Sequence, residues 1–147
     1  MYKRILVPTD GSALSKKAVK SAVDLASATG AEVVALNVVP RYPRSYFEGG
    51  LALSAAEIER IEQQWTEQGQ ALADAVGKAA GKAGVTARAI TVRSDLVAEA
   101  ILAAARKARC DLVVMASHGR KGLKRLLLGS ETQHVLTHGN IPVLVVR

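Results

Sequence analysis

The sequence predicts a single α/β domain, built as an open five-stranded parallel sheet with helices on both faces. Five short apolar segments alternate with segments of helical periodicity along the 147 residues. In four of these segments apolar residues stand at consecutive positions, as in strands that are covered on both faces. Strict alternation of strands and helices favours parallel strands joined by right-handed crossovers. The length is that of one ordinary domain, so we assign residues 1–147 to one unit.

The first half of the chain predicts two strands and two helices. We expect strands at residues 3–8 and 32–39, with a helix between them that Ser12 caps and Gly30 ends. The capping box Ser54-Ala55-Ala56-Glu57 opens a long second helix that closes near Gly81 and Gly84. One face of that helix carries Ile58, Ile61, Trp65, Leu72 and Val76. Arg41–Leu53 is a long connection, because prolines and glycines interrupt it.

The second half predicts three strands, at residues 87–92, 112–116 and 141–146, and two helices. Ser94 or Asp95 is expected to cap the first of these helices, whose inner face holds Val97, Ile101, Ala104, Ala105 and Ala108. A second capping box, Ser130-Glu131-Thr132-Gln133, opens the last helix, and Gly139 ends it.

Composition and charge narrow the classes of function. The chain has a formal charge of +7, which suits anionic partners, but the basic residues are scattered and no basic–aromatic stripe indicates nucleic-acid binding. No apolar run approaches the roughly 20 residues of a membrane span, and no signal-peptide core follows Met1. We therefore expect a cytoplasmic protein that does not enter the membrane. Cys110 is expected to border the core as a small apolar side chain.

The chemistry of the sequence is concentrated in the loop that runs from Ala116 to Ser130. Glycines there allow close backbone approach, and a helix start supplies free amides that favour a phosphate. The loop is neither a Walker P-loop nor a G-x-G-x-x-G loop, so the residues alone leave a phosphate site and a structural turn equally open. If the first and fourth strands are neighbours where the strand order reverses, their terminal loops form one cleft. Asp10 would then be either a ligand contact or a turn residue that binds local amides.

Several motifs in order resemble the universal stress protein family. Gly119, nine intervening residues, Gly129 and Ser130 match most of its signature G-x2-G-x9-G-[S/T]. The opening Ile5-Leu-Val-Pro-Thr-Asp-Gly-Ser12 and the flanks Asp111–Met115 and Pro142–Val146 are also similar to the family. The resemblance implies a Rossmann-like fold of the adenine nucleotide alpha hydrolase type. It departs at Ala116, where the signature has its first glycine; we expect a negative φ there, which alanine tolerates.

The resemblance also implies a ligand, ATP or AMP, with Mg²⁺ as a further candidate, and a role in stress adaptation. Pro8, Thr9 and Asp10 would line the adenosine end, and Val38 would offer backbone groups to adenine. The phosphates would lie against Ala116, Ser117, His118, Gly119, Arg120, Gly129, Ser130, Glu131 and Thr132. Because the family includes members that do not bind ATP, an interaction module without nucleotide and a slow ATPase stay open as alternatives.

The same resemblance implies a homodimer that pairs through the last strand, Ile141–Val146, whose apolar edge needs a cover. Two other groups are set aside on their spacing. His134 and His138 are four residues apart on a helix but have no evident third metal ligand. Ser117 and His118 are sequence neighbours, which rarely point together as a nucleophile and its base.

Overall fold

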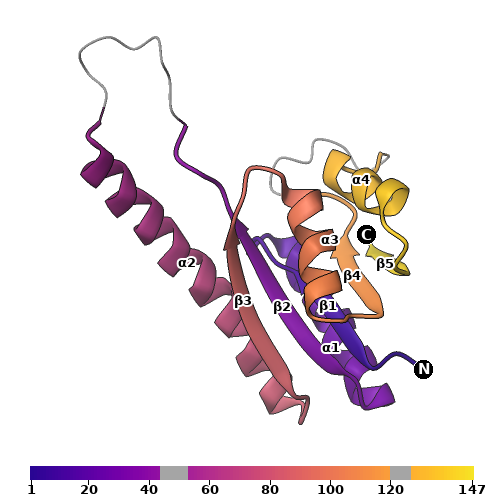
Figure 1. Ribbon diagram of the computed structural model, residues 1–147. Helices are drawn as coiled ribbons and strands as arrows, with labels where there is room; N and C mark the ends of the chain where they lie inside the picture. The colour runs from indigo at the N-terminus through magenta and orange to yellow at the C-terminus, as the bar shows by residue number, and fades with distance from the viewer. Residues whose placement is uncertain (44–52, 120–126) are drawn as a thin grey trace.

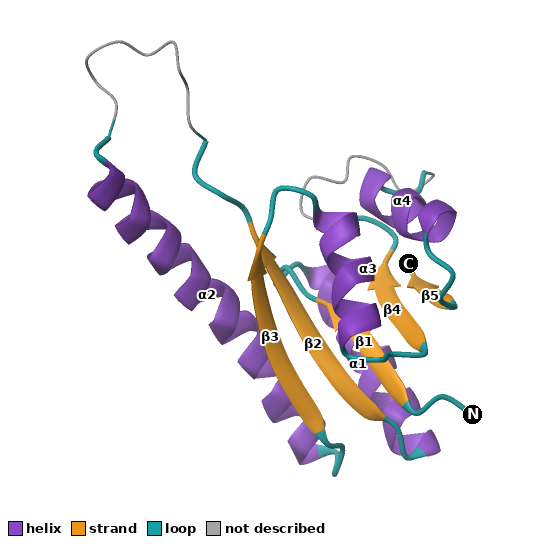
Figure 2. Ribbon diagram, in the orientation of Figure 1, coloured by secondary structure: helices purple, strands orange, loops and turns teal. Residues whose placement is uncertain are grey.

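The computed structural model describes residues 1–43, 53–119 and 127–147. Its elements follow one another as the sequence predicts, strand and helix in alternation (Figure 1, Figure 2). In chain order they are β1 (Arg4–Pro8), α1 (Ala13–Thr29), β2 (Glu32–Val39), α2 (Ala55–Lys82), β3 (Ala87–Arg93), α3 (Val97–Lys107), β4 (Leu112–Ala116), α4 (Ser130–His138) and β5 (Val143–Val146).

The described strands form one five-stranded parallel sheet in the order β3-β2-β1-β4-β5. Ile5 of β1 pairs with Val33 of β2 on one side and with Leu112 of β4 on the other. The chain therefore adds β2 and β3 on one side of β1, then crosses over to add β4 and β5 on the other. This confirms the predicted fold class and places the reversal of strand order between β1 and β4, as a shared cleft requires.

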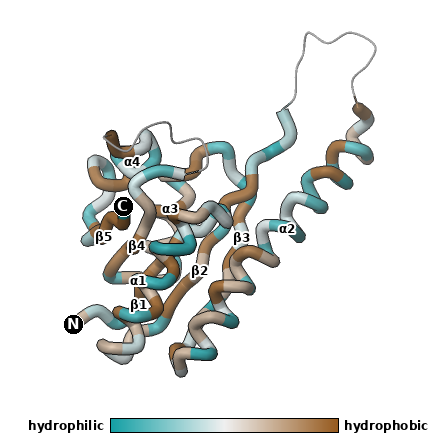
Figure 3. The backbone as a smooth tube through the Cα atoms, turned by 180° about the vertical axis from the view of Figure 1, so that it is seen from behind, coloured by the Kyte–Doolittle hydropathy of each residue, from teal (hydrophilic) through white to brown (hydrophobic). Residues whose placement is uncertain are grey.

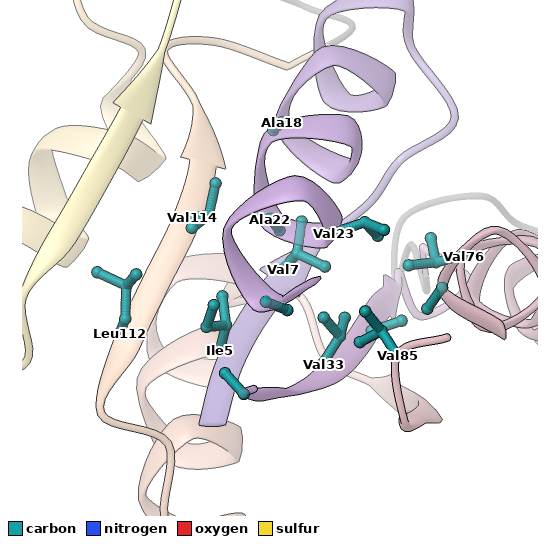
Figure 4. Close-up of a cluster of buried hydrophobic side chains, with 14 of the residues drawn as sticks. Ile5, Val7, Ala18, Ala22, Val23, Val33, Val76, Val85, Leu112 and Val114 are labelled. Carbon is teal, nitrogen blue, oxygen red and sulfur yellow. The ribbon is translucent and has the colours of Figure 1, made fainter. Parts of the chain in front are cut away.

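Two clusters of buried apolar residues cover the two faces of the sheet. Alternate strand residues point to opposite faces, so Ile5 and Val7 join one cluster while Leu6 joins the other. The first cluster packs α1 and α2 onto the sheet, and Figure 4 shows part of it. The second packs α3 and α4 onto the opposite face. Helices thus cover both faces, and the hydropathy colours in Figure 3 show that the strands between them are largely apolar.

The predicted inner face of helix α2 is confirmed at Val76 but not at its other large apolar residues, which are only partly buried. The side chains that it buries are small, apart from one acid: Glu62, Gly69, Ala73, Val76 and Ala80. Figure 1 shows the reason, because the N-terminal part of α2, which carries Ile58, Ile61 and Trp65, extends past the ends of the strands. Trp65 instead stacks on Tyr42, with ring centroids 6.1 Å apart.

Three predicted helix and strand starts are wrong in detail. Strand β5 begins at Val143, because Pro142 has no N–H to give to the ladder. The N-cap of α3 is Leu96, without a side-chain capping bond; Ser94 and Asp95 instead accept the amides of Leu96 and Arg41. The N-cap of α4 is Gly129, so the second capping box does not form. None of the described helices is long and apolar enough to cross a membrane.

Candidate functional site

Two turns meet at the carboxyl ends of β1 and β4. A Cβ on Gly119, in the β4 turn, would lie 3.0 Å from Oδ2 of Asp10, in the β1 turn. That spacing is tighter than ordinary van der Waals contact, so a larger residue at 119 would press on the carboxylate. The structure therefore brings together the two loops that the sequence assigns to one cleft, at the reversal of strand order.

The β1 turn is fixed by hydrogen bonds on every side. Thr9 donates its amide to the Leu36 carbonyl at 2.8 Å and accepts the Asn37 side-chain amide at its own carbonyl at 2.7 Å. Asp10 Oδ1 accepts the Ser12 amide at 2.9 Å, so Asp10 does bind a local amide, as the structural interpretation expects. This bond turns the other carboxylate oxygen, Oδ2, toward Gly119. Asp10 is thus a turn residue whose carboxylate also lies against the β4 turn.

Asn37 is a site residue that the motif analysis missed. It is 6% exposed and is the one polar residue within the apolar run of β2, which is the signal that could have found it. Its side chain reaches Thr9 and so positions the turn that carries Asp10.

The backbone of Val38 points to the side of β2 on which β1 has already ended. Backbone groups of alternate residues in a strand point to the same side. Leu36 directs its carbonyl to the β1 side, where Thr9 donates to it, whereas Val39 directs its carbonyl to Ser94 on the β3 side. The N–H and C=O of Val38 consequently point to the β1 side, and β1 itself ends at Pro8, opposite Leu36.

The β4 turn is closed by Gly129 and Thr132. Gly129 donates its amide to Ser117 O at 2.7 Å, and the Thr132 hydroxyl lies 3.0 Å from Ala116 O and 3.2 Å from Ser117 O. Ala116 is the last residue of β4, pairs with Val146 and has no positive φ. The prediction that this position does not need a glycine conformation is confirmed.

Gly129 is required by the loop itself. A Cβ there would lie 3.2 Å from both His118 Cα and Ser117 O, so this glycine permits the close return of the chain. The glycine at 129 therefore has a structural reason that is independent of any ligand.

The first turn of α4 carries amides that have no partner within the helix. Ser130, Glu131 and Thr132 are the first three residues of the helix, and their amides precede the first intrahelical bond, from Gln133 to Gly129. The Ser130 hydroxyl makes no capping bond in the described part of the chain. The carboxylate of Glu131 turns away and accepts the Ala98 amide at 2.8 Å, where it caps α3. At α3 this distant carboxylate therefore does what the sequence assigned to Ser94 or Asp95.

The remaining candidate residues are the neighbours Ser117 and His118, the two histidines of α4, and Arg120. Ser117 Oγ and His118 Nδ1 are 3.2 Å apart, so the expectation that these neighbours point apart is wrong. The Ser117 side chain is buried at 7% exposure, which leaves no approach for a substrate carbonyl. His134 and His138 stack with centroids 4.1 Å apart. Arg120 lies outside the described residues, as do residues 44–52 of the long connection.

Cys110 is remote from this cleft and packs against the second core cluster, as predicted. Desolvation raises the pKa of its thiol from 9.0 to about 11, and the guanidinium groups of Arg4 and Arg88 offset only part of that rise. The thiol is therefore protonated near neutral pH, which suits a packing role.

The arrangement is that of an open α/β sheet whose candidate loops lie at the switch point, and similar proteins identify its family. The universal stress protein family model matches residues 1–147. The chain is 37% identical to universal stress protein MJ0531 of Methanocaldococcus jannaschii over 147 residues, 100% of this chain and 83% of that protein. This chain therefore belongs to the universal stress protein family.

Solved structures agree with the assignment. Protein MJ0577, also from Methanocaldococcus jannaschii, superposes with a TM-score of 0.71 and 30% identity, covering 99% of this chain and 96% of that chain. A universal stress protein solved in complex with cAMP superposes with a TM-score of 0.71 and 25% identity, covering 99% of this chain and 97% of that chain.

Proposed function

We propose that this protein binds an adenine nucleotide, ATP or AMP, between the carboxyl ends of β1 and β4, and acts as a homodimeric regulatory protein of the stress response in the cytoplasm. One observation carries the proposal: the Asp10 turn and the Gly119 turn meet at the point where the strand order reverses. We treat residues 1–147 as the one domain that does this.

The adenosine end would lie over the end of β1. Val38 directs one N–H and one C=O into the space that β1 leaves, a donor and an acceptor that suit the N1 and N6 groups of adenine. Asp10 Oδ2 lies beside that space and can accept a ribose hydroxyl. Asn37 would hold the Thr9 carbonyl, and with it Asp10, in place while the nucleotide binds.

The phosphate end would lie at the start of α4. The amides of Ser130, Glu131 and Thr132 point out of the helix start, where the helix dipole favours an anion. The Ser130 hydroxyl is a further donor, since it does not cap its own helix. These donors hold phosphate oxygens through the backbone, so the methyl of Ala116 does not remove any of them. Bound Mg²⁺ would reduce the charge of a triphosphate here.

Relatives support an adenine ligand. A universal stress protein of the same fold, 25% identical to this chain, was solved with cAMP. Residues of this chain offer the matching chemistry, a backbone pair for adenine and free amides for a phosphate.

The homodimer would form through β5. This strand is the edge of the sheet next to β4, and Leu144 on it is 43% exposed. A second copy of β5 would cover the apolar side chains and pair the free backbone edge.

Calorimetric titration with ATP, AMP and GTP tests the ligand. We expect saturable binding of the adenine nucleotides, weaker binding of GTP, and about 2.7 kcal/mol of added stability at 100 times the dissociation constant. Ser130→Ala should weaken ATP and AMP, whereas Ser27→Ala, an exposed serine on α1, should not. No heat and no thermal shift at millimolar adenine nucleotide would overturn the proposal and favour an interaction module that binds no nucleotide.

A further inference from the structure

An apolar groove runs between α1 and α2, on the side of the two helices that faces away from the sheet. It has a volume of about 540 Å³. Its apolar lining comes from both helices: Val19, Val23, Leu72, Ala75, Val76 and Ala79. Val23 and Val76 are buried and form its floor, and Figure 4 shows them turned toward one another from the two helices. Ala75 and Ala79 are exposed, so the groove is open to solvent along its side.

The dimensions of the groove suit a short helix. Its lining residues extend from Lys16 to Asp24 on α1 and from Leu72 to Ala83 on α2. At about 1.5 Å per residue, these stretches are roughly 12–16 Å long, which is about three helical turns. Figure 1 shows α1 and α2 on the same side of the sheet. A groove bounded by two helices accepts a third helix that inserts apolar side chains at i, i+3 or i+4, and i+7.

The rim of the groove is positively charged. Lys16, Lys20 and Lys82 line it, and all three are exposed. Asp24 is the acidic residue of the lining, and its carboxylate pairs with the Lys20 ammonium at 2.6 Å. Lys16 lies near the start of α1 and Lys82 at the end of α2, and neither forms an ion pair with a described residue. An occupant with acidic residues at both ends would complement this rim.

We propose that this groove docks an acidic amphipathic helix of a partner protein. Leucine or methionine side chains of the helix would fill the space above Val23 and Val76, and its glutamates or aspartates would reach Lys16 and Lys82. The groove lies along the helices, and at one end its lining reaches Thr9 and Gly11 of the β1 turn, next to the proposed nucleotide site. The docking does not require the nucleotide, and its test is made without one.

A designed peptide supplies the probe. It is a fluorescein-labelled helix about 14 residues long, with leucines at i, i+3, i+7 and i+10 and glutamates on its flanks. Two controls have the same length: one shuffles the order of the same residues, and the other replaces the glutamates by lysine. We expect saturable anisotropy for the acidic amphipathic peptide and at least roughly tenfold weaker binding for both controls. Equal binding of the shuffled peptide would overturn the proposal.

Paired charge reversals locate the binding. Lys16→Glu/Lys82→Glu reverses the two ends of the groove, and Lys17→Glu/Lys78→Glu reverses two exposed lysines of the same helices that do not line it. Both variants change the net charge equally. We expect a roughly tenfold rise in the peptide dissociation constant for the first and less than about twofold for the second. Equal losses would show that overall charge, not the groove, attracts the peptide.

The apolar lining is tested separately. Ala75→Gln places a long polar side chain in the groove at an exposed position, and Ala56→Gln does the same on α2 outside it. Only Ala75→Gln should weaken the peptide, again by roughly tenfold, while both variants keep the thermal stability of the parent within about 2 °C. Sedimentation of the same variants detects self-association. If Ala75→Gln changes the oligomeric state and the peptide does not bind, the groove is a contact between two copies, and the proposal fails.

Discussion

Replacing Gly69 by alanine should disturb the packing of helix α2 on the sheet and lower the stability of the fold. An added Cβ would lie 2.3 Å from Asn37 Oδ1 and 2.7 Å from Val39 Cγ2, distances that real Cβ atoms do not reach. Asn37 cannot easily move away, because it is buried and its amide donates to Thr9 O at 2.7 Å. Either α2 moves outward or the Asn37–Thr9 hydrogen bond breaks.

The magnitude follows from three opposing effects. Overpacking of this kind costs about 1–3 kcal/mol, and a broken buried hydrogen bond costs about 1 kcal/mol. Replacing a helix-interior glycine by alanine returns about 1 kcal/mol of helix propensity. Gly69→Ala should therefore lower the free energy of unfolding by about 1–3 kcal/mol.

Gly77→Ala is the matched control. Gly77 lies in the same helix, and a Cβ there meets nothing within 4 Å. This change should stabilise the protein by about 0.5–1 kcal/mol, because only helix propensity is altered. In thermal melts followed by circular dichroism, we expect the midpoint of Gly69→Ala to fall by roughly 3–10 °C and that of Gly77→Ala to rise by a few degrees. If both alanine variants melt above the parent, the close approach of α2 to β2 is not as described.

Three further predictions concern pH and ligand preference. Desolvation opposes ionisation of Asp111, but hydrogen bonds from the amides of Arg4 and Lys3 outweigh it and hold its pKa below the ordinary 3.8. The stabilisation by this carboxylate is therefore present above pH 3.8 and lost as the pH falls through the depressed pKa. The melting temperature of Asp111→Asn should be below that of the parent at pH 7, and the two temperatures should become equal in acid. A difference that stays constant across pH would contradict this. Desolvation raises the pKa of Cys110 to about 11. Its rate of alkylation by iodoacetamide in the folded protein should therefore rise steeply up to about pH 11, whereas in urea, where the pKa returns to about 9.0, the rate should level off above about pH 10. Ala116→Gly should strengthen ATP relative to AMP by about 1 kcal/mol in calorimetric titration, because the methyl narrows the path of a longer polyphosphate; an unchanged ratio would show that this methyl does not contact the phosphates.

The sequence predicted the features that depend on local patterns. Continuous apolar runs identified the buried strands, and the Ser54–Glu57 capping box forms as expected at the start of α2. The cap of α3 could not be predicted, because it is the carboxylate of Glu131, which is distant in sequence and reaches Ala98 only after the chain has folded. The predicted box of α4 fails for a separate reason, because Gly129 is the N-cap of that helix and Ser130 is its first helical residue. The cap of α3 shows that a tertiary partner can take the place of the local side chain that a motif predicts.

The buried face of α2 also depends on a contact with a distant part of the chain. Large apolar residues usually mark the face of a helix that packs on the core. Here the core-facing positions over β2 need small residues, since the helix lies close enough to the sheet that even a methyl at 69 would collide with Asn37. The sequence does carry this information, in the form of a glycine inside a helix, where it costs about 1 kcal/mol relative to alanine. Such a glycine indicates close approach, but its partner can be named only from the structure.

Asn37 connects these constraints to the candidate site. A buried amide in a strand of valines costs free energy unless its hydrogen bonds are made, and an apolar residue would serve the core better. Thr91, its register partner in β3, adds a hydroxyl that is buried without a partner among the described residues. Burying these two polar groups on an apolar face of the sheet costs free energy, and core packing alone gives no reason for them. The Asn37 bond to Thr9 does explain the first, because it fixes the turn that carries Asp10 at the switch point. The close contact between Gly69 and Asn37 therefore serves the position of the β1 turn as well as the attachment of α2.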